Sequence, residues 1–243
     1  SQSPISVIAA LGMGQIAPLT PAPPISPEVL GQMTHIVALA GAEQVQAALA
    51  TGADIILCGR TTDTAIIAAL PLLRGDHAGG AWHGAKIAEC GALCSTNPTS
   101  GVIMVDFDAA GFSVEPMALD AACTPHSVSA HMLYENADPF ILHEPGGHLD
   151  VRGASYMALD ARRVRVEGSI WQPAPYTVKL EGARIAGYQT TILATLRAPH
   201  YVAHAKDWVA RLTAFLHADI ARKMALPAES YQLEFRLIGV DAT

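Results

Sequence analysis

Apolar residues in the first half of the chain fall into short runs, separated by longer stretches with helical spacing. Residues 54–58 and 102–107 are short apolar runs with the length of buried strands. Residues 63–73 and 80–95 lie between them and carry apolar residues at the spacing of helices. The order strand, helix, helix, strand predicts an α/β fold whose N-terminal part has a mainly parallel sheet and flanking helices.

The pattern changes after about residue 120, where shorter alternating segments begin. A helix is predicted to start at Thr124-Pro125, and a long amphipathic helix is predicted over residues 202–220. The expected strands of this part are residues 156–159, 164–166, 176–180, 189–197 and 231–238. The C-terminal part is therefore expected to be α+β, with mostly antiparallel strands and one long helix. We expect two domains, residues 1–120 and 121–243.

The composition argues against several classes of protein. Of the 243 residues, 51% are hydrophobic and 15% are charged, so the chain can bury a large core. The net charge is −7 and no basic run is present, so no binding to nucleic acid is expected. Proline interrupts the uncharged residues 1–27, and no membrane-spanning helix is predicted. No signal-peptide pattern is seen, and the four cysteines have apolar neighbours, which favours free thiols and a cytoplasmic location.

The sequence CGRTTD follows the apolar run 54–58, at the end of an expected strand. Open α/β sheets bind ligands at the carboxyl ends of their strands. There the guanidinium of Arg60 can clamp a carboxylate or phosphate, and Asp63 can pair with it or act as a base. In the structural alternative, Thr62 and Asp63 only cap the next helix. The neighbouring residues that we expect to contact a substrate are Gly59, Thr61 and Thr62.

Two further candidates lie in the middle of the chain. Glu89 is a more plausible acid or base than Cys90 is a nucleophile. The spacing of Cys90 and Cys94 is a weak metal pattern without partner ligands, so no metal ion is predicted. His131 and Glu135 are four residues apart on one helix face, where they can orient and carry a proton. An ordinary surface helix explains the same spacing.

A loop and a later strand complete the candidate set. His143 and Gly146 belong to the sequence HEPGG, whose backbone can wrap around a ligand. Lys179 and Glu181 lie two residues apart on one face of an expected strand, where they can form an ion pair or present a cation to a substrate. The catalytic residues that we expect are Arg60, Asp63, Glu89, Glu135 and Lys179.

Five segments within residues 36–197 carry a resemblance to a known family. They are ALATGADIILCGRTTDTAIIAALPL, GAKIAECGA, CTPHSVSAHMLYENADPFILHEPGGHLD, VRVEGS and APYTVKLEGARIAGYQT. With these segments, in the same order, the chain resembles the acyclic terpene utilisation protein A (AtuA-like) family. The resemblance implies a role in the catabolism of terpenes and other acids, often handled as CoA thioesters, and it implies no particular reaction.

The resemblance also implies partners. The resemblance implies a longer chain, in which an α/β segment precedes the region seen here. Some members of the family are accompanied by a small companion protein. We therefore expect a homo- or hetero-oligomer, in which a separate polypeptide or a cleaved N-terminal piece completes the sheet.

Three functions are consistent with these residues. The first is an enzyme that abstracts a proton from a small carboxylate or acyl-CoA substrate, as a hydratase, lyase or isomerase. Arg60 would hold the anion, Asp63, Glu89 or Glu135 would be the base, and Lys179 would stabilise an enolate. The second is a non-catalytic subunit that binds and presents a partner enzyme or its intermediate, and the third is a metal-dependent hydrolase. No cofactor is expected, because neither a Walker A motif nor G-x-G-x-x-G is present.

Overall fold

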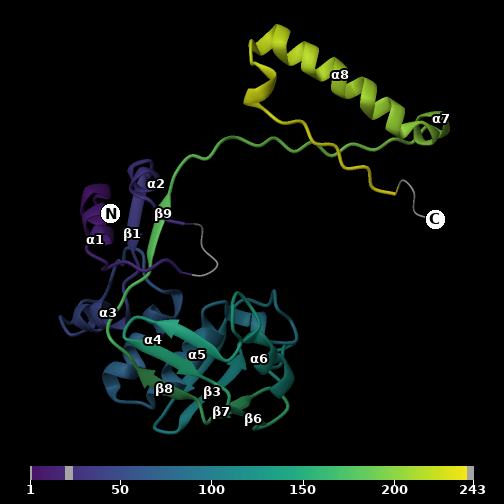
Figure 1. The fold of residues 1–243 in the computed structure, drawn as a ribbon. Helices are drawn as coiled ribbons and strands as arrows, with labels where there is room; N and C mark the ends of the chain where they lie inside the picture. Colours follow the sequence, from purple (N-terminus) through teal and green to yellow (C-terminus); the bar gives the residue numbers. More distant parts are fainter. Residues whose placement is uncertain (1, 20–23, 240–243) are drawn as a thin grey trace. The chain divides into compact units, whose positions relative to one another are not determined.

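The computed structural model describes residues 2–19 and 24–239 and divides into two compact units (Figure 1). Unit 1 covers Ser1–Ala186, and unit 2 covers Gly187–Thr243. Within the described residues, all strands belong to unit 1, and unit 2 holds the helices α7 (Pro199–Ala203) and α8 (Ala205–Met224). The domain boundary that the sequence suggests near residue 120 stays a prediction.

The larger sheet of unit 1 has four antiparallel strands in the order β2-β3-β7-β6. They are β2 (Ile103–Phe107), β3 (Gly111–Pro116), β7 (Val164–Glu167) and β6 (Ser155–Ala158). Alternate residues of the two central strands are fully buried, namely Phe112, Val114, Val164 and Val166. This alternation places one face of the sheet on the hydrophobic core. The strands predicted at residues 156–159 and 164–166 are observed as β6 and β7, which pair with each other as an antiparallel hairpin.

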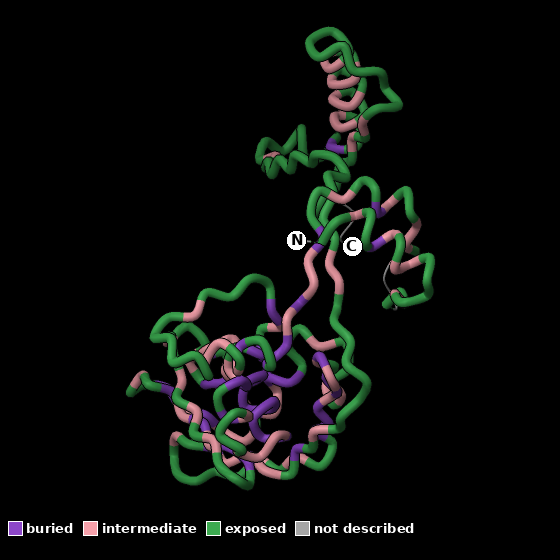
Figure 2. Tube along the Cα trace, turned by 90° about the vertical axis from the view of Figure 1, so that its left-hand side faces the viewer, coloured by how far each residue is buried: buried purple, intermediate pink, exposed green. Residues whose placement is uncertain are grey.

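A second antiparallel sheet, of order β4-β5-β8, contains β4 (Ile141–Glu144), β5 (Gly147–Asp150) and β8 (Ile170–Pro173). Helix α5 (Ala78–Ala88) packs against strands of both sheets, and every residue from position 79 to position 87 is buried. A Cβ atom at Gly80 would lie 2.7 Å from the Cα atom of Gly111 in β3. Glycine therefore allows α5 to approach the larger sheet closely. Buried residues gather in this part of unit 1 (Figure 2).

Helix α4 (Asp63–Arg74) packs beside α5, and α3 (Ala42–Leu49) packs on α4. The helix predicted over residues 63–73 is thus observed. It ends at Gly75, whose φ of 82° is the left-handed conformation that glycine adopts readily at this position. Helix α6 (Pro125–His131) also begins where the sequence predicts, because the side chain of Thr124 accepts a hydrogen bond from the N–H group of Ser127.

A smaller part of unit 1 has its own apolar cluster. Strands β1 (His35–Ala38) and β9 (Leu180–Ala183) form a two-stranded antiparallel sheet. Helices α1 (Pro4–Gly12) and α2 (Pro27–Gly31) lie beside it. The buried residues of this cluster are Val7, Leu30 and Ile36.

The prediction of a parallel sheet is wrong, because all three sheets of the described residues are antiparallel. Residues 54–58 form no strand, and Ile55 and Leu57 are 81% and 93% exposed. Among the described residues, the one parallel pairing is an isolated bridge between Ala40 and Thr61. The segment has the composition of a buried strand, but a strand also needs a neighbour, and no described strand lies along it.

Unit 2 contains the long helix that the sequence predicts, observed as α8. Residues 189–197 and 231–238 were expected to be strands, but they pair with no strand in the described part of the chain. A hydrogen bond of 2.7 Å between the ring of His217 and the hydroxyl of Tyr231 links α8 to the second of these segments. In residues 2–19 and 24–239, no helix has both the length and the apolar character needed to cross a membrane.

Candidate functional site

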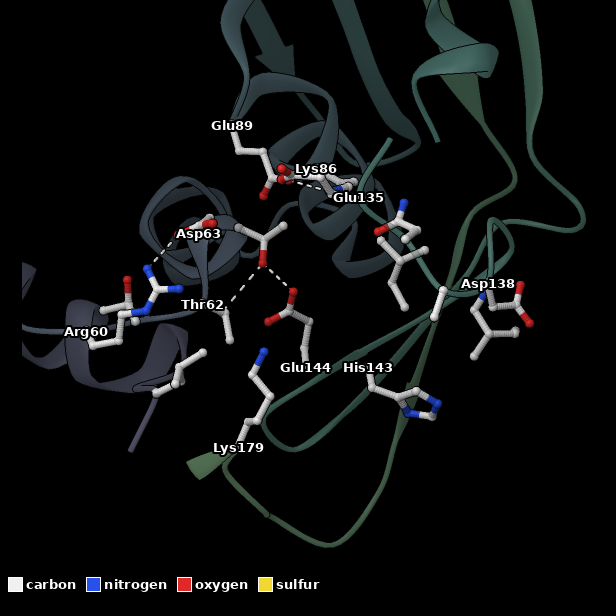
Figure 3. A pocket seen from close by; sticks show the side chains of 17 residues that line it. Arg60, Thr62, Asp63, Lys86, Glu89, Glu135, Asp138, His143, Glu144 and Lys179 are labelled. Atoms are coloured by element: carbon white, nitrogen blue, oxygen red, sulfur yellow. Dashed lines mark hydrogen bonds and ion pairs between the residues drawn. The ribbon is translucent and has the colours of Figure 1, made fainter. Parts of the chain in front are cut away.

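A cavity of about 640 Å³ in unit 1 collects side chains from distant parts of the sequence (Figure 3). The loop before α4, the C-terminal end of α5, the loop after α6, β4 and the residue before β9 all contribute to its lining. All five residues expected to be catalytic lie along it, namely Arg60, Asp63, Glu89, Glu135 and Lys179. Their roles stay predictions, but the fold brings them to one place.

The ion pair between Lys86 and Glu89 forms part of the lining of this cavity. The two side chains are 7% and 9% exposed, so both charged groups are largely removed from water. Lys86 lies in the last turn of α5, and Glu89 follows directly after the helix. Burial raises the pKa of Glu89, and the hydrogen bond from the Lys86 ammonium opposes this shift only in part.

Glu144, at the end of β4, supplies a second carboxyl group. Its Oε1 atom accepts a hydrogen bond from the Thr64 hydroxyl, while its Oε2 atom is buried and has no hydrogen-bond partner among the described residues. Burial raises the pKa of Glu144, and hydrogen bonds from Thr62 and Thr64 act in the opposite direction. The cavity therefore holds two carboxyl groups whose protonated forms are favoured by their surroundings.

Two cations stand at the more exposed side of the cavity. Arg60 Nε donates a hydrogen bond to Glu181 Oε2 at 3.4 Å, and Lys179 Nζ lies 3.1 Å from Glu181 Oε1. A longer contact of 3.7 Å joins Arg60 to Asp63 at the start of α4. The ion pair, one of the two alternatives for Lys179 and Glu181, is thus present, and its hydrogen bond lowers the pKa of Glu181. Glu181 holds the two cations side by side.

Glu135 is held in an unusual backbone conformation. Its φ is 56°, in the left-handed region that a glutamate rarely adopts. Such conformations cost free energy and often occur at functional sites. His143 of β4 also lines the cavity, although its side chain is exposed, and its ring lies 5.6 Å from that of His148 in β5.

The expected substrate-binding residues are only partly gathered here. Thr61, Thr62 and His143 line the cavity. Glu181 is not part of the lining, but it pairs with Arg60 and Lys179, which are. Gly59, His131 and Gly146 are also not part of the lining.

The positions of His131 and Gly146 outside the cavity lining have structural explanations. His131 is buried beside Tyr134, its Nε2 atom has no partner among the described residues, and burial lowers its pKa. Gly146 has a φ of 82° and forms the turn between β4 and β5.

The cavity is also lined by residues that the sequence did not predict, among them Lys86, Thr64 and Glu144. A signal for Glu144 exists in the alternation of β4, because Glu144 lies two residues after the buried Leu142 and shares its inward face. For Lys86, the signal is a single cation in an otherwise small and apolar helix, AGGAWHGAKIA. Thr64 carries no comparable signal.

The described residues contain no group of three His, Cys, Asp or Glu side chains suited to a metal ion. The arrangement is one of paired carboxyl groups and cations. Such a site can bind an anion at its cationic side and move a proton at its buried side.

Comparison with known proteins gave one result. A family model described as acyclic terpene utilisation family protein AtuA matches residues 22–243. No curated protein and no solved structure matches the chain.

Proposed function

Since the chain belongs to the acyclic terpene utilisation AtuA family, we propose that it is an enzyme of terpene or acid catabolism. Its reaction begins with abstraction of a proton from a carboxylate or acyl-CoA substrate, as in a hydratase, lyase or isomerase. The substrate is a small molecule, and the chain's own side chains carry out the chemistry.

The observation that carries this proposal is the pair of buried carboxyl groups, Glu89 and Glu144, in one cavity. Both have a raised pKa because burial disfavours the charged form. A carboxyl group with an ordinary pKa is a weak base at neutral pH, and raising its pKa makes it a better one. Carboxyl groups with a raised pKa in a cavity are typical of proton-transfer sites.

Glu89 is the preferred base. Lys86 holds its carboxyl group in a fixed position by a charge-assisted hydrogen bond, which acts to lower the pKa that burial raises. Glu144 faces the same cavity from β4 and can return a proton to the substrate or product. In this arrangement, the two carboxyl groups divide the roles of base and acid.

Arg60 and Lys179 are suited to bind the acidic end of the substrate. Both now contact Glu181, and all three side chains are more than a third exposed. Exposed ion pairs contribute only about 0–1 kcal/mol each. A substrate carboxylate can therefore replace Glu181 as their partner at little cost. Lys179 points toward Glu144, where it can also stabilise the negative charge of an enolate (Figure 3).

The proposal is tested by exchange of substrate protons with deuterated water, followed by mass spectrometry over a panel of short acids and acyl-CoA thioesters. Glu89→Gln keeps the shape of the side chain and should lower the exchange rate by about 10²–10⁴-fold. Arg60→Ala should mainly raise KM. The matched control is Glu234→Gln, a carboxylate 58% exposed in unit 2, which should exchange at the native rate. Full exchange by Glu89→Gln would remove Glu89 from the mechanism, and absence of exchange with every compound would count against the reaction class.

A further inference from the structure

Two of the four cysteines, Cys94 and Cys123, lie side by side in the core of unit 1. Cys94 is the last residue of the short helix η1 (Gly91–Cys94), and Cys123 lies two positions before the start of α6. Their Sγ atoms are 3.9 Å apart and share a hydrogen bond, although 29 positions separate them in the sequence. Both are free thiols, with 0% and 2% of the residue exposed. A buried cysteine is commonly a small apolar side chain, but two in sulfur-to-sulfur contact are also a dithiol that oxidation can close.

The backbone around the two cysteines is already aligned. An antiparallel bridge pairs Ser95 with Cys123. The N–H group of Thr96 donates a hydrogen bond of 2.9 Å to the carbonyl of Ala122, and the Thr96 hydroxyl accepts one of 3.0 Å from the N–H group of Ala122. For a disulfide, the sulfur atoms must close from 3.9 Å to about 2 Å, while these backbone contacts hold the two segments together.

The two thiols differ in their surroundings. With the Cys94 thiol as donor, their hydrogen bond lowers the pKa of Cys123, and the guanidinium of Arg162 acts in the same direction, against burial and Glu115. Arg162 is held there by hydrogen bonds to three backbone carbonyl groups. The same sulfur-to-sulfur hydrogen bond, together with burial, raises the pKa of Cys94. Since the thiolate is the reactive form, Cys123 is the more reactive partner.

We infer that Cys94 and Cys123 are an oxidisable pair, which a hydroperoxide converts into a disulfide between η1 and the segment that precedes α6. The loop closed by this bond contains the whole hairpin β2–β3, so the bond fixes the two ends of the hairpin to each other. A disulfide that forms only on oxidation is the kind found in redox-sensing proteins of reducing compartments. The inference does not depend on the proposed function.

The reaction has two steps. The Cys123 thiolate attacks one oxygen atom of hydrogen peroxide, so that an S–O bond forms, the O–O bond breaks and the released hydroxide takes up a proton as water. The sulfur of Cys94 then attacks the sulfenic acid at Cys123, so that the S–S bond forms, the S–O bond breaks and a second water leaves with the Cys94 proton. In total, the two thiols lose two protons and two electrons, and hydrogen peroxide is reduced to two molecules of water.

Peptide mapping of the full native chain is the first test. The chain is treated with hydrogen peroxide, its remaining thiols are blocked with N-ethylmaleimide in urea, and it is cleaved before aspartate. Cleavage gives residues 76–105, which hold Cys90 and Cys94, and residues 120–137, which hold Cys123. We expect these two peptides to be joined, at a mass about 2 Da below their sum, and to separate with dithiothreitol. Recovery of both peptides unlinked, or linked only to other peptides, overturns the inference.

Two variants decide which cysteine of residues 76–105 is the partner. Cys90→Ser is the matched control and should form the link like the native chain, whereas Cys94→Ser should lose it. A link that persists in Cys94→Ser, or is lost in Cys90→Ser, would make Cys90 the partner and overturn the assignment. The mapping of the native chain stands even if a variant folds poorly.

Unfolding in urea supplies a second measurement on the native chain. A bond between Cys94 and Cys123 restricts the unfolded chain, so oxidation should raise the urea midpoint by about 1 M. Dithiothreitol should reverse this rise. A lower midpoint after oxidation would show that the bond distorts the folded chain, and would contradict the alignment that the inference rests on.

Discussion

At the scale of single residues, the carboxyl group of Glu144 is removed from water and forms no ion pair with a described residue. Thr64 donates a hydrogen bond to one oxygen, and the other oxygen is buried without a partner among the described residues. Burial disfavours mainly the ionised form of Glu144, so the folded protein holds the proton more tightly than the unfolded chain does.

This environment predicts a pH dependence of stability. Between the ordinary pKa of 4.5 and the raised pKa of Glu144, the folded state binds a proton that the unfolded state has lost. The free energy of unfolding therefore falls as pH rises through this window. Glu144→Gln removes this contribution, so the variant should gain stability relative to the native chain as pH increases. Urea unfolding at several pH values between about 4 and 8 measures the difference.

Glu181 provides a control of opposite sign. The hydrogen bond from Lys179 lowers the pKa of Glu181, so its contribution is present above the ordinary pKa and is lost as pH falls through the lowered value. Glu181→Gln should therefore lose a small amount of stability at neutral pH. If Glu144→Gln shifted stability equally at every pH, the explanation based on a buried carboxyl group would be wrong.

At the scale of elements, helix α5 can pack closely against the two larger sheets because it is rich in small residues. A Cβ atom at Gly80 would meet the Cα, C and O atoms of Gly111 at 2.7–3.1 Å, and these backbone atoms cannot move without displacing β3. Glycine is a poor helix former in isolation, so close packing on the sheet explains its presence here better than helix propensity does.

Gly80→Ala should therefore destabilise the protein by about 1–3 kcal/mol through overpacking. The matched control is Gly12→Ala at the end of α1, where a Cβ atom meets nothing within 4 Å. There the loss of freedom in the unfolded chain should stabilise the protein by about 0.4–1 kcal/mol. Thermal and urea unfolding of both variants measures the two effects. Equal effects at positions 12 and 80 would contradict the packing argument.

The elements that could be predicted from sequence are those specified by local signals. Helix α4 has an acidic first residue and a glycine after its end, α8 has a long amphipathic pattern, and the β6–β7 hairpin has a polar turn between two alternating segments. Each of these signals acts over neighbouring residues. The pattern of residues 54–58 is equally strong, but whether such a run becomes a strand depends on a partner elsewhere.

The site was partly predictable for the same reason. Arg60 and Asp63 follow an apolar run and begin a helix, and this local context marked them. Lys86 and Glu144 were not predicted as site residues, because their importance comes from burial. Burial is set by the packing of α5 and β4 and not by the neighbouring sequence.

At the scale of the whole molecule, the chain consists of two units joined by residues with little protection. Residues 184–197 contain no helix, strand, turn or bend, and almost all of their side chains are exposed. Exposed segments without backbone hydrogen bonds are the preferred sites of proteolysis. Arg184 and Arg197 place trypsin sites at both ends of this segment.

Limited trypsin digestion should therefore cut first after Arg184 or Arg197 and release an N-terminal fragment that resists further cleavage. Intact mass and N-terminal sequencing of the fragments identify the bond. Arg165 provides an internal comparison, because it lies in β7 and its side chain is 14% exposed and paired with Asp108 and Glu167. Initial cleavage after Arg165 would contradict this description of the two units.

Helix α5 has a consequence for the order in which the molecule comes apart. It contacts the four-stranded sheet and the three-stranded sheet at once, so neither sheet can separate from it without exposing buried residues that the other sheet also covers. The two sheets are thus bound into a single cooperative folding unit. Strands β1 and β9 rest on a different apolar cluster, and they can open while that unit remains folded.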